Sequence, residues 1–257
     1  MSCAKVSASI VVYGDFEEAA KTVSSVLAYT KGVALQLFVI DNASPGTTGA
    51  QLQAAFGTQC TVLQLEKNLG FGKGHNACLP LLDSEFHFVI NPDITLQSDV
   101  LTEMAQYLQA HPDVAMATPA MRFPDGRAQH TAKRKPTFLG LLARQLPGKM
   151  LAKHETHYLM LDEDLSAPRE VEFCSGCFFA MRTQVFCGMG GFDPAYFMYV
   201  EDADITQKAL QYGKAVFLPQ FFVTHAWHRD ARRKVKNFVW QIRSMLRYWH
   251  KWGFRWR

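Results

Sequence analysis

The most constraining feature of this sequence is a regular alternation of short apolar runs with segments of helical periodicity along its first half. The apolar runs predict strands at 8–13, 35–40, 61–65 and 86–90. Apolar residues at helical spacing predict helices at 17–28, 51–56, 74–82 and 99–110. Strands interleaved with helices predict a largely parallel sheet with helices on both faces, an α/β fold. Ligands of such sheets bind beyond the carboxyl ends of the strands, so the residues that follow each strand are the first site candidates.

Polar residues follow three of the predicted strands. The sequence has Asp41-Asn42-Ala43-Ser44 after the second strand, a glycine-rich stretch from Asn68 to Asn76 after the third, and Asn91-Pro92-Asp93 after the fourth. A carboxylate at a strand end can accept from a nucleobase or ribose, and a glycine-rich turn before a helix brings backbone amides to phosphate. An acid such as Asp93 can hold a divalent cation that bridges a diphosphate. Ordinary turn chemistry explains each motif about equally well when it is taken alone.

The glycine-rich stretch departs from two familiar nucleotide-binding patterns. Lys73 is followed by Gly74, so the stretch lacks the Lys-Ser/Thr pair that ends a P-loop. It also follows a third strand, without the acid about twenty residues further on that contacts the ribose in dinucleotide-binding folds. These departures disfavour a P-loop nucleotidase and a conventional dinucleotide-dependent enzyme. His75, within this stretch, is interpreted as a loop residue and not as a metal ligand.

The second half opens with a Pro- and basic-rich stretch at 121–169 that contains an apolar patch at 138–142. It has three open interpretations: a partly mobile loop over a site, a lipid-facing segment, or a solvated connector. Further on, an aromatic run leads to Glu201, Asp202 and Asp204 at a predicted helix start, and a further strand is predicted at 215–218. Repulsion among three acids is costly unless a cation or the helix N-terminus offsets it. A carboxylate there is a candidate general base, although an acidic first turn is also common without function.

Charge is divided unevenly along the chain. Residues 229–257 hold ten Lys and Arg residues against one acid, a net charge of +9, which leaves −5 for the other 228 residues of a chain that totals +4. An acidic body argues against duplex nucleic acid as the main partner, because phosphate neutralisation needs a basic face on the fold itself.

The basic tail is predicted to contain one amphipathic helix over 233–252, because its apolar residues recur at steps of three and four. Four of the five tryptophans lie in this tail. Trp with Lys and Arg on an amphipathic helix is typical of a membrane-surface element, and packing of the apolar stripe on the body is the alternative. Both hold if the stripe near Val235 packs on the body while residues 252–257 face anionic lipid.

Six cysteines are scattered without the spacing of a disulfide framework, and Cys174-x-x-Cys177 has no second pair with zinc-ligand spacing. These two cysteines are therefore interpreted as packing residues. The apolar runs are too short to span a bilayer, and the start of the sequence does not resemble a signal peptide. We expect a cytoplasmic protein.

Taken together, these motifs resemble family 2 glycosyltransferases with the GT-A fold, and most closely the bacterial rhamnosyltransferase-like members that build O-antigen and other surface polysaccharides. The resemblance covers about residues 6–250. Its matching residues, in order, are Val11-Val12-Tyr13, Asp41-Asn42-Ala43-Ser44, Asn68-Leu69-Gly70-Phe71-Gly72, Asn76, Asn91-Pro92-Asp93, Ser175-Gly176, Arg182, Gly190-Gly191-Phe192-Asp193, Phe197 to Asp204, and His225.

The resemblance implies an inverting transfer of a sugar from a nucleotide diphosphate donor. Asp93 and His225 match the ligands of a Mg²⁺ or Mn²⁺ ion that stabilises the leaving diphosphate, and Asp202, paired with Glu201, matches the catalytic base. The residues that the resemblance assigns to nucleotide-sugar binding are Val12, Tyr13, Asp41, Asn42, Asn68, Gly70, Phe71, Asn76, Asn91, Asp93 and Gly176.

The resemblance also implies a domain organisation and a set of partners. We expect a GT-A domain at 1–228, with a nucleotide-sugar-binding half at about 1–118 and an acceptor and catalytic half at 119–228, followed by the basic tail at 229–257. The expected donor is dTDP-L-rhamnose and the acceptor a glycan or lipid-linked glycan, at the inner face of the plasma membrane. Nucleic acid is not expected as a partner. UDP-galactose or UDP-N-acetylglucosamine as donor, and a non-catalytic sugar-nucleotide or glycan-binding relative, are the alternatives.

Overall fold

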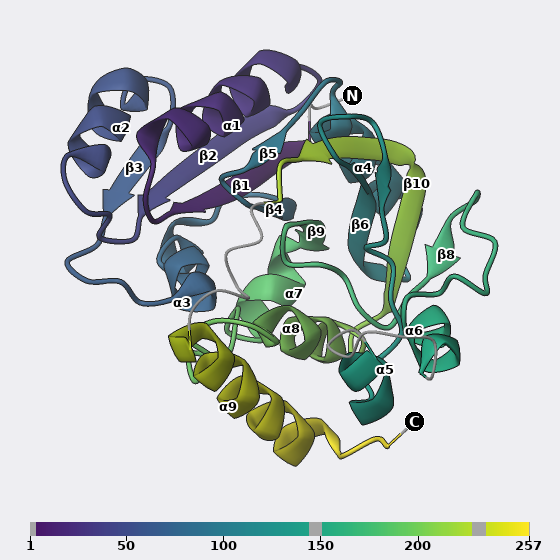
Figure 1. The fold of residues 1–257 in the computed structure, drawn as a ribbon. Coiled ribbons are helices and arrows are strands. Elements are labelled where there is room, and N and C mark those ends of the chain that lie inside the picture. Colours follow the sequence, from purple (N-terminus) through teal and green to yellow (C-terminus); the bar gives the residue numbers. More distant parts are fainter. Residues whose placement is uncertain (1–3, 144–150, 228–234, 257) are drawn as a thin grey trace.

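The computed structural model describes residues 4–143, 151–227 and 235–256. In this part of the chain ten strands form one mixed sheet (Figure 1). The strands are β1 (Lys5–Val12), β2 (Ala34–Asp41), β3 (Thr61–Gln64), β4 (Phe86–Ile90), β5 (Ile94–Thr95), β6 (Val114–Arg122), β7 (Ala128–Gln129), β8 (Arg169–Glu170), β9 (Phe178–Arg182) and β10 (Lys214–His225). Their order is β3-β2-β1-β4-β9-β6-β10-β5, and β7 and β8 pair with β6 and β10.

The first half of the sheet is parallel, as the alternating pattern predicts. β1 lies between β2 and β4 and is parallel to both, and β3 continues the parallel set beyond β2. The antiparallel strand β9 joins β4 to β6, and β10 runs parallel to β6. The carboxyl ends of β1, β2 and β4 therefore meet at one edge of the sheet, where α/β proteins bind their ligands.

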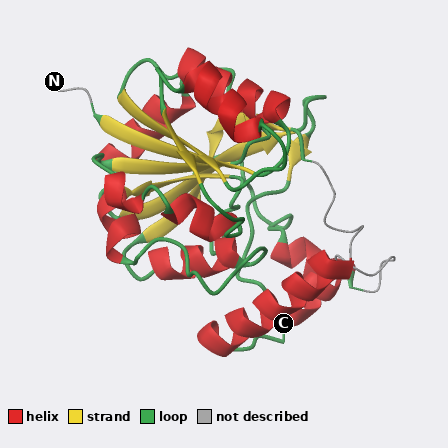
Figure 2. Ribbon diagram, turned by 90° about the vertical axis from the view of Figure 1, so that its left-hand side faces the viewer, coloured by secondary structure: helices red, strands yellow, loops and turns green. Residues whose placement is uncertain are grey.

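Helices cover both faces of the sheet (Figure 2). On one face, α1 (Phe16–Tyr29), α2 (Thr48–Phe56) and α4 (Val100–Ala110) share a core cluster with the strands. On the other face, α7 (Thr183–Gly188) and α8 (Glu201–Ala209) pack into a second cluster. Successive residues of β4 and β9 contribute to the two clusters in turn, because side chains alternate across a strand. The mixed α/β architecture predicted from the sequence is confirmed.

One predicted helix differs from the structure. The helix predicted at 74–82 is α3 (Phe71–Asn76), followed by the short 3-10 turn η1 (Leu79–Leu81). Gly70 has a φ of +84°, which only glycine adopts readily, and this sharp turn lets α3 begin directly after it. Pro80 lacks the N–H that a longer helix requires.

The strand predicted at 215–218 is only the beginning of β10, which continues to His225. The pairing of β10 with β6 shifts register between Leu218 and Phe222. Pro219 lies at this irregularity, where it removes a ladder hydrogen bond and interrupts the strand pattern in the sequence. The longer strand carries His225 to the sheet edge beside β5, with which it pairs.

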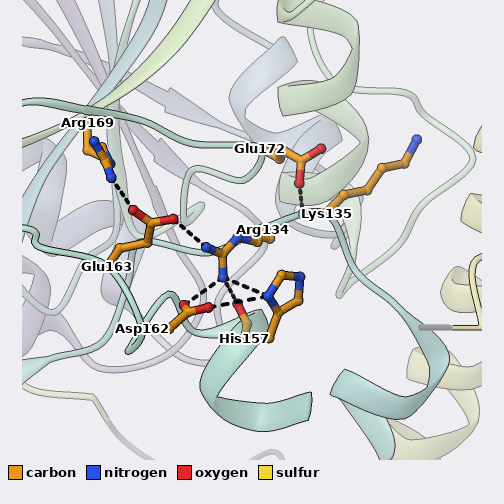
Figure 3. Close-up of polar contacts among 7 residues, drawn as sticks. All are labelled: Arg134, Lys135, His157, Asp162, Glu163, Arg169 and Glu172. Carbon is orange, nitrogen blue, oxygen red and sulfur yellow. Dashed lines mark hydrogen bonds and ion pairs between the residues drawn. The ribbon is translucent and has the colours of Figure 1, made fainter. Parts of the chain in front are cut away.

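Polar contacts order the described part of the Pro- and basic-rich stretch (Figure 3). The Arg134 guanidinium donates to the backbone carbonyl of His157 at 2.6 Å and to the carboxylates of Asp162 and Glu163 at 2.7 and 2.6 Å. Glu163 also pairs with Arg169. These bonds connect the segment before α5 (Phe138–Ala143) to the turn after α6 (Ala152–Tyr158). Residues 144–150 of the stretch lie outside the described residues.

The C-terminal helix α9 (Val235–Trp252) lies along the outer edge of the molecule next to α8 (Figures 1 and 2). Ser244 and Tyr248 are buried against the body, and the Trp252 indole N–H donates to the carboxylate of Asp204 at 2.7 Å. The Trp252 indole N–H is thus directed at a buried acid of the body, and contact of residues 252–257 with lipid stays a prediction. Among the described residues, no helix combines the length and apolar character that crossing a membrane requires.

Candidate active site

Three strand ends bring predicted site residues to the same edge of the sheet. Val12 pairs with Asp41 at the ends of β1 and β2, and Asn91 follows β4, the other neighbour of β1. The Val12 side chain is buried in the core, so its carbonyl, which accepts the Asn42 N–H at 2.8 Å, is the group presented at the edge. Tyr13 lies just beyond β1 and is 56% exposed, which leaves its ring available to a ligand.

The Asp41 carboxylate is held in a tight turn at the end of β2. It is 6% exposed and accepts the backbone N–H of Ser44 at 3.0 Å. The chain turns through Ala43, which has a φ of +59°. Gly49 approaches so closely that a Cβ there would lie 2.4 Å from Asp41 Oδ2. The start of α2 therefore crowds the carboxylate on one side, and a side chain at position 49 would displace it.

Asn42 positions the glycine-rich loop. Its amide Nδ2 donates to Asn68 Oδ1 and to the Gly70 carbonyl, both at 3.1 Å, and its Oδ1 accepts the Leu69 N–H at 2.9 Å. Asn68 Oδ1 also accepts the Gly70 N–H at 2.8 Å. Since Asn42 is 3% exposed and both ends of its amide are engaged, its contacts are with the loop. The predicted motif residues 42, 68 and 70 are thus brought together by one hydrogen-bond network.

The loop then meets the segment that precedes the acidic helix. The Phe71 N–H donates to the Phe197 carbonyl at 3.0 Å. A Cβ on Gly70 would lie 2.1 Å from the same carbonyl oxygen, so only glycine fits at this contact. The predicted donor loop and the aromatic run before Glu201 are therefore in direct backbone contact, although more than 100 residues separate them in the sequence.

Asn76, the last predicted residue of this motif, makes two hydrogen bonds to the backbone of Phe192. Its Nδ2 donates to the carbonyl of Phe192 at 2.8 Å, and its Oδ1 accepts the Phe192 N–H at 2.9 Å. Gly191, at a φ of +65°, leaves no room for a side chain next to this pair. Asn76 thus connects α3 to the Gly190-Gly191-Phe192 turn, and its binding role stays a prediction.

Asp93 and His225 come together across the edge of the sheet. His225 Nε2 lies 3.2 Å from Asp93 Oδ2, and both side chains are largely buried. His225 Nδ1 lies 2.8 Å from Gln129 Oε1, while the Gln129 amide donates to the His225 carbonyl at 2.8 Å. Gln129 can only accept at its oxygen, so Nδ1 carries a proton and Nε2 is directed at Asp93. A metal-ligating histidine is oriented in the same way by a second partner.

This pair fits a divalent cation in spacing and in chemistry. Two cis ligands at about 2.1 Å from an octahedral ion lie about 3 Å apart, close to the separation found here. The side-chain oxygen of Asn91 is buried without a hydrogen-bond partner two residues before Asp93. Among the described residues no cluster of three or more His, Cys, Asp or Glu side chains is arranged for a metal. Mg²⁺ is commonly bound by one or two protein side chains, while phosphate oxygens of the substrate and water complete its coordination shell.

The electrostatics of His225 depend on whether such a cation is present. Burial lowers the pKa of His225, but the hydrogen bond to Asp93 and the neighbouring Cys177 outweigh burial and raise the pKa to about 10. Without a metal, the imidazole is therefore protonated at neutral pH and paired with Asp93. A metal ion takes the place of this proton, because only the neutral ring has a lone pair to offer.

Glu201 and Asp202 stand at the start of α8 behind two strained residues. Tyr199 and Val200 both have positive φ, +70° and +67°, a conformation that is rare for a β-branched side chain. Asp202 accepts the Gly176 N–H at 3.3 Å and the Ala203 N–H at 2.9 Å. A Cβ on Gly176 would lie 3.1 Å from the Asp202 Cβ, so glycine permits this approach. Strained backbone of this kind tends to occur at functional sites.

Burial raises the pKa of both carboxyl groups. Burial, followed by the charge of Asp202, raises the pKa of Glu201 to about 8, and Glu201 Oε2 is buried without a partner. Burial also raises the pKa of Asp202, but Lys133 and the N–H groups of Gly176 and Ala203 act in the opposite direction. At neutral pH Glu201 therefore carries a proton, and Asp202 is the carboxyl group that backbone N–H donors hold in place.

One short segment connects the two halves of the candidate site. Gly176 bonds to Asp202, and the carbonyl of the next residue, Cys177, accepts the Asn91 N–H at 2.8 Å. The Phe71 ring lies 3.5 Å from the position that a Gly176 Cβ would occupy. Residues 176–177 thus place the acidic helix, the Asn91 motif and the glycine-rich loop around one point.

Asp204, the third acid of the cluster, has a separate role. It is fully buried and accepts from Lys251 Nζ at 2.8 Å and from the Trp252 indole at 2.7 Å. Its charge is thus offset by α9. Sequence reasoning did not identify Lys251 and Trp252 as its partners, nor Gln129 as the partner of His225. The sequence shows the basic residues of the tail and the acids of α8. It does not show which of them pair, because the pairing depends on how α9 packs against α8.

The structure corrects the interpretation of His75 as a loop residue. His75 lies in α3 and is fully buried, with Nδ1 2.7 Å from the hydroxyl of Ser9 on β1. Its ring packs edge-on against Phe71 at 4.6 Å between centroids. Burial, followed by the charge of His87, keeps the pKa of His75 well below its usual range. Flanking glycines made the residue look like part of a loop, while its partner on β1 is distant in sequence.

Comparison with solved structures defines the fold as that of GT-A glycosyltransferases. The crystal structure of GalNAc-T7 with UDP, GalNAc and Mn²⁺ matches at a TM-score of 0.71 and 16% identity, over 97% of this chain and 48% of that chain. S. aureus TarS 1-349 in complex with UDP-GlcNAc matches at 0.64 and 16% identity, over 95% and 66% of the two chains. The mannosyltransferase PcManGT from Pyrobaculum calidifontis, in complex with GDP-Man and Mn²⁺, matches at 0.63 and 14% identity, over 96% and 65%.

Sequence comparison makes the assignment more specific. The profile of the family described as "Glycosyl transferase family 2" matches residues 7–188, and the chain belongs to this family. It is 26% identical over 190 residues to Rhamnosyltransferase WbbL of Escherichia coli (strain K12), covering 70% of this chain and 69% of that protein. It is 27% identical over 180 residues to the N-acetylglucosaminyl-diphospho-decaprenol L-rhamnosyltransferase of Mycobacterium tuberculosis (strain ATCC 25618 / H37Rv), covering 69% of this chain and 57% of that protein. The resemblance inferred from the motifs is confirmed.

Proposed function

We propose that this glycosyltransferase moves L-rhamnose from dTDP-L-rhamnose, with inversion at the anomeric carbon, to a lipid-linked glycan. Two relatives named as rhamnosyltransferases support the donor sugar, and the name of the mycobacterial relative supports a lipid diphosphate acceptor. The observation that carries the catalytic part is the Gly176-Cys177 segment, which bonds to Asp202 on one side and to Asn91 on the other. A base and a diphosphate site held by consecutive residues are what a direct displacement requires.

We assign the donor side to the edge formed by β1, β2 and β4. Asp41 and Tyr13 face the nucleoside, and the backbone around Asn68 and Gly70 follows the phosphates. In this assignment Val12, Asn42 and Asn76 act through the backbone and loops that they hold, since Val12 and Asn42 are buried and the Asn76 amide is bonded to Phe192. Phe71 and Gly176 close the site towards the acidic helix.

We propose that Asp93 and His225 hold one Mg²⁺ or Mn²⁺ ion. Their 3.2 Å separation and the orientation imposed on His225 by Gln129 support this assignment. Such a cation supplies positive charge to the leaving diphosphate. The neighbouring structures with Mn²⁺ show that enzymes of this fold have been crystallised with a divalent ion.

In the proposed displacement, Asp202 accepts the proton of the acceptor hydroxyl while the hydroxyl oxygen bonds to the anomeric carbon. The bond from that carbon to the diphosphate breaks at the same time, and the nucleoside diphosphate leaves. A single displacement inverts the configuration and needs one base, and Asp202, which the N–H groups of Gly176 and Ala203 hold in place, fits this role. Because the protonated Glu201 side chain is neutral, it adds no second negative charge near the reacting centre.

The test of the base is Asp202→Asn, with Glu201→Gln as the matched control at the neighbouring position. Because general base catalysis typically contributes about 10²- to 10⁴-fold, we expect kcat to fall by about that factor in Asp202→Asn, with dTDP affinity retained. The reduction in Glu201→Gln is expected to be smaller, since Gln preserves a neutral side chain. Full turnover by Asp202→Asn would show that another group is the base.

The donor is tested by thermal shift with a panel of nucleotide sugars and Mn²⁺. A ligand at 100 times its Kd stabilises a folded protein by about 2.7 kcal/mol, so donors that bind are readily distinguished. We expect the largest shift with dTDP-L-rhamnose. A larger shift with UDP-galactose or UDP-N-acetylglucosamine would replace the donor assignment. Binding of donors with no metal-dependent turnover of any of them would favour a non-catalytic relative.

The proposed acceptor determines where the enzyme works. A lipid diphosphate carrier confines the reaction to a membrane surface, whereas a nucleotide sugar is charged and reaches that surface from water. We therefore propose that the protein acts peripherally at the inner face of the plasma membrane, with its basic tail in contact with anionic lipid.

A further inference from the structure

The inward face of α9 supports the loop that leads to the catalytic acids. The Ser244 hydroxyl donates to the Met198 carbonyl at 3.0 Å, and the Trp240 ring lies 4.5 Å from that of Phe197. Lys251 Nζ bonds to Asp193 at 2.9 Å, at the start of the same loop. Contacts distributed along three turns of the helix therefore hold residues 193–198 in place.

The supported loop is in contact with both sides of the candidate site. The Phe197 carbonyl accepts the Phe71 N–H of the donor loop at 3.0 Å. Immediately afterwards, Tyr199 and Val200 turn the chain with positive φ into α8. In α8, Asp204 is bonded to Lys251 and Trp252. The position of α9 and the position of the catalytic helix are thus linked through the buried carboxylate of Asp204.

The outward face of α9 has a different character. Val239, Ile242 and Leu246 are 42%, 40% and 60% exposed and lie on one side of the helix, at spacings of three and four residues. Beside this apolar row lie the exposed side chains of Arg243, Arg247 and His250. Arg247 and His250, together with Asp193 and Lys251, line a surface cavity of about 670 Å³. An apolar row flanked by cations on an outer helix is the pattern of a helix that lies in a membrane interface.

Aromatic residues extend this face beyond the end of the helix. Phe254 and Trp256 are 55% and 57% exposed. They pack around Phe138, whose ring lies 5.0 Å from that of Trp256, and the Phe138 N–H donates to the Arg255 carbonyl at 2.9 Å. Residues 254–256 are therefore anchored on α5. Partly exposed Trp and Phe rings are suited to the headgroup region of a bilayer.

We propose that this face, defined by Val239, Ile242, Arg243, Leu246 and Arg247, docks on an anionic phospholipid bilayer. Two features favour a bilayer over a second copy of the chain. In a two-fold dimer through this face, the arginines of one copy would be brought towards those of the other, and like charges at an interface are unfavourable. Anionic headgroups complement the same arginines, and each basic residue near such a surface contributes to binding.

Docking through this face also restricts which acceptors can reach the site. This inference rests on the proposed function. A helix with its side chains has a radius of about 5 Å, and packed helices are about 8–10 Å apart, so Asp202 on α8 lies roughly 15 Å from the bilayer surface. We infer that the acceptor hydroxyl belongs to a short lipid-linked glycan, on a sugar near the diphosphate. A long polymer would present its growing end far beyond this distance.

Membrane docking is tested by co-sedimentation of the full chain with vesicles of phosphatidylcholine alone or with phosphatidylglycerol added. We expect binding to the anionic vesicles that weakens with salt, and little binding to the neutral ones. Arg243→Glu/Arg247→Glu should reduce the partition coefficient about tenfold or more, and Ile242→Ser/Leu246→Ser should also reduce it. The control Lys21→Glu/Lys31→Glu, which makes the same change in net charge on α1 and the adjoining residues, should bind like the parent chain.

The proposal would be overturned if the Arg243→Glu/Arg247→Glu variant bound anionic vesicles as well as the parent chain does. It would also be overturned if the parent chain formed concentration-dependent dimers that the Ile242→Ser/Leu246→Ser variant does not form. A failure of the proposed function is distinguished by its own readout, since vesicle binding is measured without donor or acceptor. Given transfer activity, docking predicts that both docking variants raise KM for a vesicle-embedded acceptor while leaving kcat on a water-soluble analogue unchanged. An unchanged KM on vesicles would contradict it.

Discussion

Removal of the Asp204 carboxylate tests whether α9 is an integral part of the catalytic fold. Asp204 is fully buried, and its oxygens accept from Lys251 at 2.8 Å and from Trp252 at 2.7 Å. Breaking a buried ion pair by removing one partner costs about 3–5 kcal/mol, because the remaining charge loses its compensation. The Lys251 side chain is 33% exposed and keeps Asp193, which places Asp204→Ala near the lower end, at about 3 kcal/mol.

The matched control is Asp193→Ala, which removes the other carboxylate bonded to the same lysine. Asp193 is more exposed, with 21% of its side chain accessible, so its pair with Lys251 contributes about 1 kcal/mol or less. Urea denaturation of the two variants and the parent chain gives the comparison, provided that the m-value is unchanged. A cost for Asp204→Ala below about 1 kcal/mol, or one equal to that of Asp193→Ala, would refute the view that Asp204 anchors α9.

Three further predictions concern the metal pair and the donor loop. The pKa of His225 is raised to about 10, so the metal-free imidazole is charged at neutral pH and must lose its proton to bind a metal. The affinity for Mn²⁺ in the presence of dTDP should therefore rise about tenfold per pH unit between pH 7 and 9. Calorimetry in two buffers of different ionisation enthalpy should detect about one proton released per Mn²⁺, and no release would contradict the assignment of His225. Gln129→Leu removes the partner of His225 Nδ1 and should weaken Mn²⁺ binding by about 10- to 100-fold, whereas unchanged affinity would show that Gln129 does not orient the ring. The control variant Gly126→Ala should destabilise the fold by about 1–2 kcal/mol, because Gly126 has a positive φ but open space around it. Gly70→Ala should cost more, because its Cβ would also collide with the Phe197 carbonyl. Equal destabilisation of the two variants in thermal unfolding would mean that the Phe197 contact adds nothing.

The sequence predicted the four parallel strands β1 to β4 well because the relevant signals are local, but it did not predict β6 and β9. Apolar runs and helical periodicity mark each element within a few residues, and parallel strands place their ends together once the order is known. The polar motifs of Asp41, Asn68 and Asn91 were therefore placed at the correct edge. The strand that carries His225 was predicted too short because Pro219 interrupts its pattern, while pairing with β6 overrides that interruption.

What the sequence could not predict depends on contacts between distant segments. Gln129 and His225 are 96 residues apart, and nothing near Gln129 indicates that it will orient a histidine. His75 resembles a loop residue because glycines flank it, yet Ser9, 66 residues away, gives it a buried partner. The three acids of α8 looked alike in sequence. Only the packing of α9 separates Asp204, which Lys251 neutralises, from Asp202, which does not contact the tail in this way.

The most direct test of the central claim is the stereochemistry of transfer by the parent chain and by Asp202→Asn. The purified protein is incubated with dTDP-L-rhamnose, Mn²⁺ and a short lipid-linked acceptor, and the anomeric configuration of the product is determined by NMR. We expect a rhamnoside whose configuration is opposite to that of the donor, and a loss of product in Asp202→Asn of at least about a hundredfold. Retention of the donor configuration, or undiminished product from Asp202→Asn, would contradict a single displacement with Asp202 as its base.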